Sequence, residues 1–424
     1  MNLLHVIASL DPLSGGPCQV IRNSVPELEL LGVVNEVVCL DAPEANFLQH
    51  DNFKTHALGP GKSAWCHSSK LLPWLTSNLP RFDAVIVHGL WLYPSYAVSK
   101  AVRVLTKMGA ASKTIGGKVP KVFVMPHGML DPYFQKASGR RIKALRNIIY
   151  WALIEGNVIK EADSLLFTCE EELRLAREPF RPYAPKGEIS VGLGILEPPV
   201  FTPRMKDAFL KKCPGVEEDS YLLFLSRIHP KKGVDLLLKA YGKMIRKLSE
   251  TQLSSAVYAG ADQLEVTYRS FPAAFPKLVI AGPGLESSYG REVQQLVASS
   301  DELARSVFFP GMLSGDAKWG AFYGCDAFVL PSHQENFGIA VAEALACGKP
   351  VLLSKEVNIW REIERDAGGL FAEDTLNGIY EMLMTWESMS LDQKMTMGGR
   401  ARIAFEKHFA VGPAAERLRD ALLV

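Results

Sequence analysis

Two carboxylates stand eight residues apart in the stretch of the chain that is richest in chemistry. The stretch covers residues 331–350 and reads PSHQENFGIAVAEALACGKP. An apolar run over 327–330 precedes it, which predicts a strand, then a loop with Glu335, then a helix over 338–346 with Glu343. Carboxylates accept hydrogen bonds from sugar hydroxyls, and a helix start attracts an anion. The spacing therefore predicts a loop that holds a phosphate at its middle and hydroxyl-rich groups at its ends, which suits a sugar nucleotide.

Arg227 and Lys232 form a second candidate set, because they follow the predicted strand 221–226 and precede a helix that starts near Gly233. A guanidinium and an ammonium at a helix start can stabilise the charge that grows on a diphosphate leaving group, without a metal. Taken alone, the pair is better explained as two solvated charges beside a turn. Their combination with the other loops makes a phosphate site the better interpretation.

Gly15 and Gly16 lie between the first predicted strand and the first predicted helix. Adjacent glycines let the backbone approach a phosphate closely, although a tight strand-to-helix turn alone would also explain them. Their spacing differs from the Gly-x-Gly-x-x-Gly pattern of a dinucleotide site followed by an acid. That difference argues against a dinucleotide-dependent oxidoreductase.

His127 and His88 each follow a predicted strand of the first half. Ligands of doubly wound sheets bind at the carboxyl ends of strands, so we expect His127 to bond a sugar or to polarise the reacting centre. His88 is a weaker candidate on the acceptor side. Trp91 and Tyr93 could stack on an acceptor sugar, but aromatic residues after a strand more often belong to the core.

Short apolar runs alternate with helix-period segments along the whole chain, which predicts parallel sheets covered by helices. The expected strands are 3–8, 36–40, 83–87, 121–125, 164–168, 188–191, 221–226, 277–281, 306–309, 326–330 and 351–353, and the expected helices include 16–31, 94–107, 233–247, 286–299, 338–346 and 412–423. Three prolines in 197–203 indicate a linker between two series. We therefore predict domains over 1–200 and 201–408 and a terminal helix within 409–424.

The composition agrees with a two-domain globular protein and excludes several classes. A chain of 424 residues exceeds one ordinary core, and a net charge of +1 argues against a nucleic-acid partner. Seven scattered cysteines without a Cys-x-x-Cys pair disfavour a disulfide framework and a zinc site. The sequence shows no signal peptide and no run of about 18 apolar residues, so we expect a cytoplasmic location.

On these motifs the chain resembles the retaining glycosyltransferases of family 4, of the type that assembles bacterial polysaccharides. The segments that carry the resemblance are SRIHPKKG at 226–233, LVIAGPG at 278–284, FFPGM at 308–312, the loop at 331–350, SGGP at 14–17 and PHG at 126–128. The match is specific over 221–371 and looser over 1–200. One departure is LGIL at 193–196, where the family often has Asn-Gly-Ile-Asp.

The resemblance implies a GT-B fold, in which two Rossmann-like domains face each other across a cleft and the last helix packs back on the first domain. It implies transfer of a hexose, with retention of configuration, from a UDP-sugar such as UDP-glucose to a saccharide or lipid-linked acceptor. Front-face substitution without a metal or other cofactor is expected. It gives catalytic roles to His127 and Glu335, and donor-binding roles to Gly15, Gly16, Arg227, Lys232, Gly282, Met312, Asn336, Phe337, Gly338, Ile339 and Glu343.

Two functional alternatives stay open, namely a non-catalytic nucleotide-sugar-binding protein of the same fold and a phosphorylase or epimerase. Two segments also lack an assigned role. The segment 248–274 is long and polar. A basic segment with Lys136, Arg140, Arg141, Lys143 and Arg146 precedes the apolar run 148–154. Such a helix could touch the cytoplasmic face of a membrane, but we expect one packed face and one solvated face.

Overall fold

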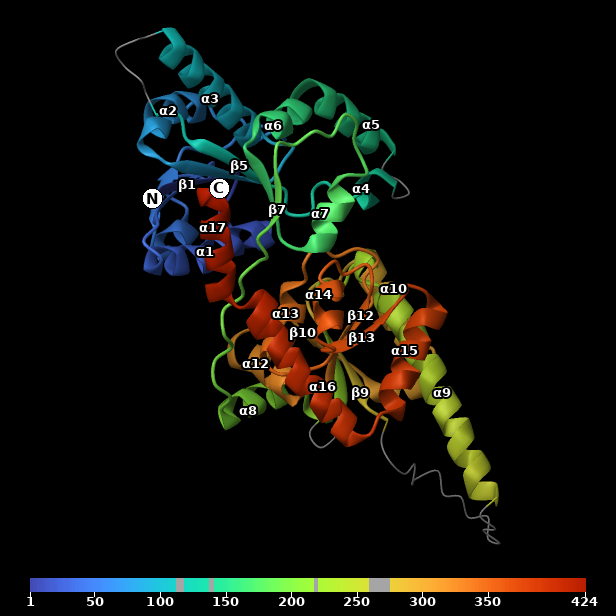
Figure 1. Ribbon diagram of the computed structural model, residues 1–424. Coiled ribbons are helices and arrows are strands. Elements are labelled where there is room, and N and C mark those ends of the chain that lie inside the picture. The colour runs from blue at the N-terminus through green and yellow to red at the C-terminus, as the bar shows by residue number, and fades with distance from the viewer. Residues whose placement is uncertain (112–117, 137–140, 217–219, 259–274) are drawn as a thin grey trace. The chain divides into compact units, whose positions relative to one another are not determined.

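The chain forms two compact α/β units (Figure 1). The computed structural model describes residues 1–111, 118–136, 141–216, 220–258 and 275–424. The first unit comprises Met1–Leu196 together with His408–Val424, and the second comprises Glu197–Lys407. The chain therefore changes unit at the start of the proline-containing linker. Most of the polar segment 248–274, namely 259–274, lies outside the described residues, as does Arg140.

The first unit is built on a parallel sheet with the strand order β3-β2-β1-β4-β5-β6-β7. Its strands are β1 (Asn2–Ile7), β2 (Val34–Cys39), β3 (Lys54–Ala57), β4 (Ala84–His88), β5 (Lys121–Met125), β6 (Ser164–Phe167) and β7 (Glu188–Ser190). The central strands are apolar along their length and buried on both faces, as expected for a sheet covered by helices. The pairing of Ile7 with His88, and of His88 with Met125, aligns the carboxyl ends of β1, β4 and β5.

Helices flank this sheet. They are α1 (Gly16–Leu30), α2 (Leu71–Asn78), α3 (Tyr93–Ala111), α4 (Tyr133–Lys136), α5 (Arg141–Tyr150), a π-helical turn Trp151–Glu155, α6 (Gly156–Glu161), α7 (Glu170–Ala176) and α17 (Val411–Leu423). The last of them, α17, lies beside α1 within the first unit (Figure 1). Ile195 accepts the N–H of Val411 over 3.1 Å, and a Cβ on Gly194 would come within 2.7 Å of Val411 Cα. Gly194 in the LGIL segment therefore has a packing role.

The second unit has a parallel sheet with the order β10-β9-β8-β11-β12-β13. Its strands are β8 (Tyr221–Leu225), β9 (Lys277–Ala281), β10 (Val307–Gly311), β11 (Ala327–Leu330), β12 (Val351–Ser354) and β13 (Gly369–Ala372). Its helices are α8 (Pro203–Lys212), α9 (Val234–Tyr258), α10 (Ser288–Ala298), α11 (Asp301–Ser306), α12 (Gly315–Gly324), α13 (Ile339–Ala346), α14 (Trp360–Arg365), α15 (Leu376–Ser388) and α16 (Leu391–Ala404).

The two parallel sheets confirm the predicted α/β class with two Rossmann-like domains. Two strands were not predicted, β3 and β13, and both are edge strands of their sheets. Each has four residues, and neither has a fully buried run that would mark it as a strand. In the described part of the chain, no helix has the length and hydropathy needed to cross a bilayer.

Candidate functional site

Most of the predicted donor residues of the second unit lie just beyond the carboxyl ends of its strands. Arg227 and Lys232 follow β8, Gly282 follows β9, Met312 follows β10, and residues 335–339 follow β11. These strands are neighbours in the sheet. Carboxyl ends of neighbouring parallel strands share an edge, and this is where doubly wound proteins bind ligands. The fold therefore brings together residues that are far apart in the chain.

An ion pair between Lys232 and Glu335 joins the loops after β8 and β11. Both side chains are largely shielded from water, with exposed fractions of 10% and 22%. The same loops are joined through their backbones, because the N–H of His333 donates to the carbonyl of Lys231 over 2.8 Å. The pair sets an ammonium beside a carboxylate, so one small area offers a partner for phosphate and a partner for sugar hydroxyls.

The backbone of Glu335 is hydrogen-bonded to the loop that follows β12. Its N–H donates to the carbonyl of Glu356 over 2.8 Å, and its carbonyl accepts from the N–H of Asn358 over 2.9 Å. The side-chain oxygen of Asn336 accepts from the amide of Asn358 over 3.5 Å. A loop fixed in this way loses less conformational entropy when it binds a ligand.

Gly338 shapes the start of α13. It has left-handed dihedral angles, with φ 78° and ψ 73°, and no side chain caps the helix. A Cβ at this position would lie 3.0 Å from Cγ2 of Val341 and 3.3 Å from Cγ of Glu335. Uncapped N–H groups at a helix start favour an anion. Ile339, the first helical residue, is half-buried, whereas Phe337 is buried and packs into the unit.

Glu343, on α13, forms an ion pair with Lys318 of α12 over 2.6 Å. Burial raises the pKa of the Glu343 carboxyl, and the charge of Lys318 opposes that rise. The Lys318 ammonium also lies 4.6 Å from the ring centroid of Trp319. Lys318 was not among the predicted site residues, because nothing in its local sequence indicates a partner on another helix.

The other predicted donor residues after these strands are Arg227, Met312 and Gly282, and they differ in how exposed they are. Arg227 and Met312 are exposed, so their side chains are open to a ligand. Gly282 has φ 142°, its N–H donates to the carbonyl of Gly311 over 2.9 Å, and a Cβ would lie 1.9 Å from the carbonyl oxygen of Ser226. Gly282 is therefore required by the close approach of three loops.

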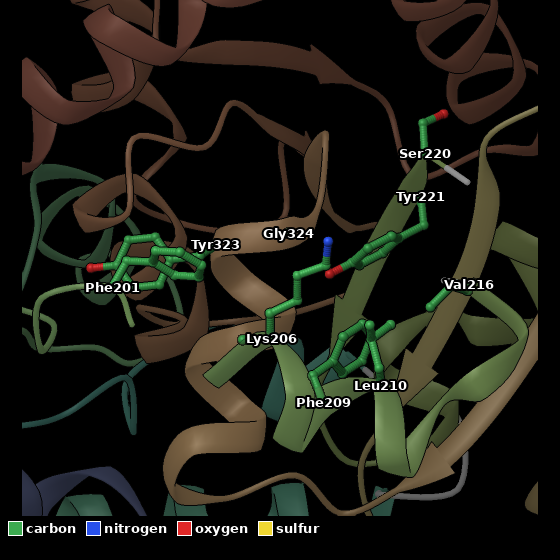
Figure 2. Close-up of a pocket in the computed structure, with 10 residues that line it drawn as sticks. Phe201, Lys206, Phe209, Leu210, Val216, Ser220, Tyr221, Tyr323 and Gly324 are labelled. Atoms are coloured by element: carbon green, nitrogen blue, oxygen red, sulfur yellow. The ribbon is translucent and has the colours of Figure 1, made fainter. Parts of the chain in front are cut away.

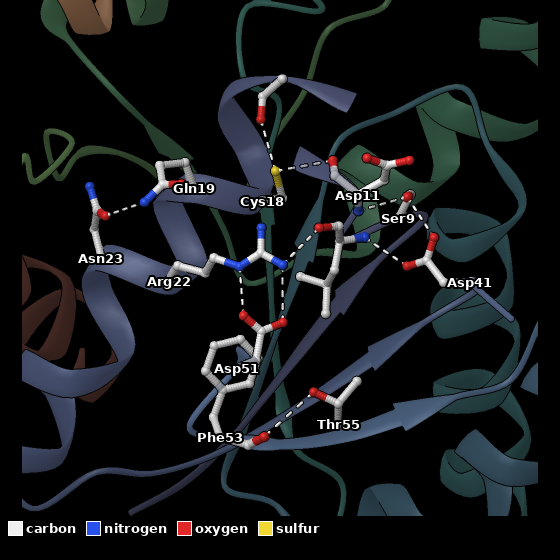
Figure 3. A network of polar contacts seen from close by, with 12 residues as sticks. Ser9, Asp11, Cys18, Gln19, Arg22, Asn23, Asp41, Asp51, Phe53 and Thr55 are labelled. Atoms are coloured by element: carbon white, nitrogen blue, oxygen red, sulfur yellow. Dashed lines mark hydrogen bonds and ion pairs between the residues drawn. The ribbon is translucent and has the colours of Figure 1, made fainter. Parts of the chain in front are cut away.

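In the first unit, Gly15 ends the loop between β1 and α1, Gly16 begins α1, and a polar network holds this loop (Figure 3). Asp41 accepts from the hydroxyl of Ser9 over 2.6 Å and from the N–H of Leu10 over 2.7 Å. The thiol of Cys18 donates to the carbonyl of Gly15 over 2.9 Å.

The first turns of α1 are fixed to the same loop. Arg22 makes two hydrogen bonds to the carboxylate of Asp51, over 2.6 and 3.0 Å, and a third to the carbonyl of Leu10 over 2.9 Å (Figure 3). The helix start that follows Gly15 is thus rigidly held, which suits a backbone contact with phosphate.

Three histidines form a continuous hydrogen-bonded row across the first sheet. His5 Nδ1 lies 3.0 Å from His88 Nε2, and His88 Nδ1 lies 3.0 Å from His127 Nε2. The ring centroids are 5.2 and 5.3 Å apart, with interplanar angles of 27° and 19°. These centroid separations and the short N–N distances mean that the three rings lie edge to edge, nearly along one line. The row begins at Asn35, whose Oδ1 lies 3.2 Å from His5 Nε2.

The tautomers follow from this row of hydrogen bonds. The Asn35 amide donates to the carbonyl of Val33, so its Oδ1 must accept from His5 Nε2–H. Burial lowers the pKa of His5 to about 4 and of His127 to about 3, and burial also lowers the pKa of His88, so the rings are neutral at pH 7. A neutral imidazole has one donor and one acceptor. His88 and His127 therefore each donate from Nε2, and Nδ1 of His127 is an acceptor.

The row changes the expected role of its members. His88 uses both ring nitrogens inside the row and is buried, so it orients His127. His127 is the last residue of the row. It lies just beyond the carboxyl end of β5, and its backbone φ is 53°. His5 and Asn35 were not among the predicted site residues, although a histidine within the apolar run 3–8 was an available signal.

The aromatic candidates pack into the first unit. Tyr93 is buried, with its ring 5.1 Å from that of Trp65, and Trp91 is half-buried, with its ring 5.3 Å from that of Phe180. The backbone N–H of Trp91 donates to Oε1 of Glu155 over 2.7 Å. These contacts give Trp91 and Tyr93 packing roles and leave little of Tyr93 for a sugar.

Glu155 is a fully buried acid that the sequence analysis also missed. Its Oε1 accepts a second hydrogen bond from the hydroxyl of Ser95 over 2.7 Å. Its Oε2 has no hydrogen-bond partner among the described residues. Burial raises the pKa of Glu155 to about 7.

A hollow of about 510 Å³ on the second unit lies elsewhere (Figure 2). It is lined by aromatic side chains, including Phe209, Tyr221 and Tyr323, and by Lys206. Tyr221 begins β8, whereas the candidate donor residues follow the end of that strand. The hollow is therefore separate from the candidate site. Within the described ranges, no group of three or more His, Cys, Asp or Glu side chains is arranged to hold a metal ion.

The two Rossmann-like units define the GT-B fold, and solved structures agree. Sucrose-phosphate synthase from Thermosynechococcus elongatus superposes with a TM-score of 0.66 at 16% identity, covering 99% of this chain and 98% of that one. HepE of Anabaena, in complex with UDP and glucose, gives a TM-score of 0.66 at 16% identity, covering 100% and 99%. WaaG, a glycosyltransferase involved in lipopolysaccharide biosynthesis, gives 0.59 at 14% identity, covering 100% and 99%.

Residues 206–383 match the family described as glycosyl transferases group 1. The D-inositol 3-phosphate glycosyltransferase of Geodermatophilus obscurus is 27% identical over 219 residues, which cover 52% of this chain and 44% of that protein. The protein of the same name from Kribbella flavida is 30% identical over 200 residues, covering 47% and 42%. The matches thus span less than half the length of these relatives. They confirm the resemblance at the level of group 1 glycosyltransferases, over the second unit.

Proposed function

We propose that the protein is a retaining glycosyltransferase that moves a hexose from a nucleotide diphosphate sugar to a saccharide or lipid-linked saccharide. The observation that carries this proposal is the Lys232–Glu335 pair beside the uncapped start of α13. UDP-glucose is the proposed donor. The complexes of HepE with UDP and with UDP-glucose support this choice, because HepE shares the fold.

The diphosphate is proposed to bind Lys232, Arg227 and the N–H groups that follow Gly338. Binding would draw Lys232 from Glu335 toward the phosphate, and Glu335 would then accept hydrogen bonds from sugar hydroxyls and favour positive charge at the anomeric carbon. The two cations and the helix start supply the charge that a metal would otherwise supply to the leaving group.

The nucleoside is proposed to bind at the other end of α13. Glu343 would accept two hydrogen bonds from the ribose hydroxyls, and the charge of Lys318 opposes the rise in its pKa that burial causes. Backbone groups around Gly311 and Met312 would contact the base.

We propose front-face substitution. As the bond from the anomeric carbon to the donor phosphate breaks, a bond to the acceptor oxygen forms on the same face, and the leaving phosphate takes the acceptor proton. In the first unit, the N–H of Gly16 is proposed to contact the diphosphate. His127, with Nδ1 as an acceptor, would take a hydrogen bond from a sugar hydroxyl, which disfavours its use to polarise the reacting centre.

Incubation of the purified protein with UDP-glucose, in the presence of EDTA, tests the activity. The proposal predicts release of UDP and of a sugar that keeps its anomeric configuration, either as slow hydrolysis or as transfer to an added saccharide. Binding without any release of UDP would instead indicate a non-catalytic sugar-nucleotide-binding protein. Formation of sugar 1-phosphate from a glucoside and inorganic phosphate would indicate a phosphorylase.

A further inference from the structure

In the helical segment formed by α5 and the π-helical turn after it, four exposed aliphatic side chains lie along one side. The exposed fractions are large for a helix that is already packed into a domain: Ile142 87%, Leu145 60%, Ile149 53% and Leu153 70%. Their spacing of three and four residues places them on one face. We call these four residues the apolar face.

The opposite side of the same segment is packed against the first unit. Asn147, Trp151 and Glu155 recur every four residues and are all buried. The ring of Trp151 lies 4.6 Å from that of Phe180, with an interplanar angle of 13°. This side therefore packs the segment onto the first unit. The segment thus has one packed face and one exposed face, as expected, and the exposed face is largely aliphatic.

Basic residues flank the apolar face on α5. Lys143 and Arg146 are exposed on α5, and residues 141–154 contain no Asp or Glu. The next acid, Glu155, is on the buried side. Lys136, on α4 just before this segment, is 74% exposed and lies 3.5 Å from Glu178. The surface is thus apolar with a basic margin.

We propose that the apolar face docks on a bilayer surface that contains anionic lipid. The four aliphatic side chains would enter the boundary between head groups and acyl chains, and Lys143 and Arg146 would lie at the lipid phosphates. A convex row of aliphatic residues suits a fluid bilayer, whereas a protein partner would need a matching groove. The inference does not rest on the proposed transfer activity.

Sedimentation with vesicles tests this proposal on the full chain. The wild type is expected to sediment with vesicles of equal parts phosphatidylcholine and phosphatidylglycerol, and to remain in the supernatant with phosphatidylcholine alone. Leu145→Glu/Leu153→Glu should abolish sedimentation. Met395→Glu/Ile403→Glu is the matched control, because those side chains are exposed to 60% and 55% on α16. The control should sediment like the wild type.

A charge variant provides a second measurement that leaves the aliphatic residues intact. Lys143→Gln/Arg146→Gln should weaken binding to the anionic vesicles roughly thirtyfold, at about fivefold per charge. The proposal is overturned if the wild type does not sediment with anionic vesicles, or if Leu145→Glu/Leu153→Glu sediments like the wild type. It is also overturned if the wild type is a dimer that this double variant makes monomeric, because a second copy then covers the face.

Discussion

At the residue scale, Lys232 and Glu335 are proposed to have different roles, since Lys232 binds the diphosphate and Glu335 acts on the sugar during turnover. Glu335→Gln removes the carboxylate that is proposed to act on the sugar but leaves Lys232 free for the diphosphate. We expect kcat to fall by about 10²–10³-fold, while the Kd for UDP stays the same or decreases. Initial-rate kinetics and calorimetry on the same preparations measure both quantities. Glu373→Gln, at an exposed ion pair with Lys355, is the control. Full activity of Glu335→Gln would remove Glu335 from the reaction.

The histidine row makes a prediction about a single proton. At pH 7, Nε2 of His127 should carry hydrogen and Nδ1 should not, because the row runs from the Asn35 amide through His5 and His88. With only nine histidines in the chain, selective ¹⁵N-histidine labelling allows assignment by comparison with His127→Gln. His5→Phe should give His127 a mixture of tautomers. A protonated Nδ1 in the wild type would contradict the proposed acceptor role.

Glu155 predicts a dependence of stability on pH. Its pKa is raised to about 7, so between its unfolded value near 4.5 and about 7 the folded protein holds a proton that the unfolded chain has lost. Stability from this group therefore decreases as pH rises through that window. Glu155→Gln mimics the neutral acid and should gain about 3 kcal/mol in unfolding free energy relative to wild type between pH 4.5 and pH 8. Urea denaturation of both proteins at the two pH values checks this, and an equal difference at both would refute it.

At the scale of elements, the start of α13 depends on Gly338. Gly338→Ala must place a Cβ in a left-handed conformation, 3.0 Å from Val341 Cγ2. We expect a loss of about 1–2 kcal/mol in unfolding free energy and weaker UDP binding. Gly399→Ala is the control, because it lies inside α16 with nothing within 4 Å of its Cβ position, and it should stabilise by about 0.5–1 kcal/mol. Unchanged stability and UDP affinity of Gly338→Ala would contradict this account of the helix start.

The interior strands and the loops that follow them could be predicted from the sequence, because strands buried on both faces are continuous apolar runs. The edge strands β3 and β13 were not predicted, because each has only four residues and neither is a continuous run of β-branched and aromatic residues. The motifs similarly indicated Glu335 and Glu343 but not Lys318, whose contact with Glu343 depends on how α12 and α13 pack. The histidine row could not be predicted, because its members are far apart in the chain and only the pairing of β1 with β4 and of β4 with β5 brings them together.

At the scale of the whole molecule, the donor residues of the proposal belong largely to the second unit, and the family match covers residues 206–383 of that unit. The first unit contributes the histidine row, the loop at Gly15 and Gly16, and the apolar face. Recognition of the nucleotide should therefore be set mainly by the second unit, whatever the acceptor is.

Calorimetric titration of the full chain with UDP, GDP, ADP and NAD, in the presence of EDTA, tests the central claim most directly. We expect UDP alone to bind tightly, and Lys232→Ala to weaken it by about tenfold or more through loss of a charge-assisted contact with the diphosphate. Failure of every nucleotide to bind, or equal UDP affinity in Lys232→Ala and wild type, would contradict the assignment of the donor site.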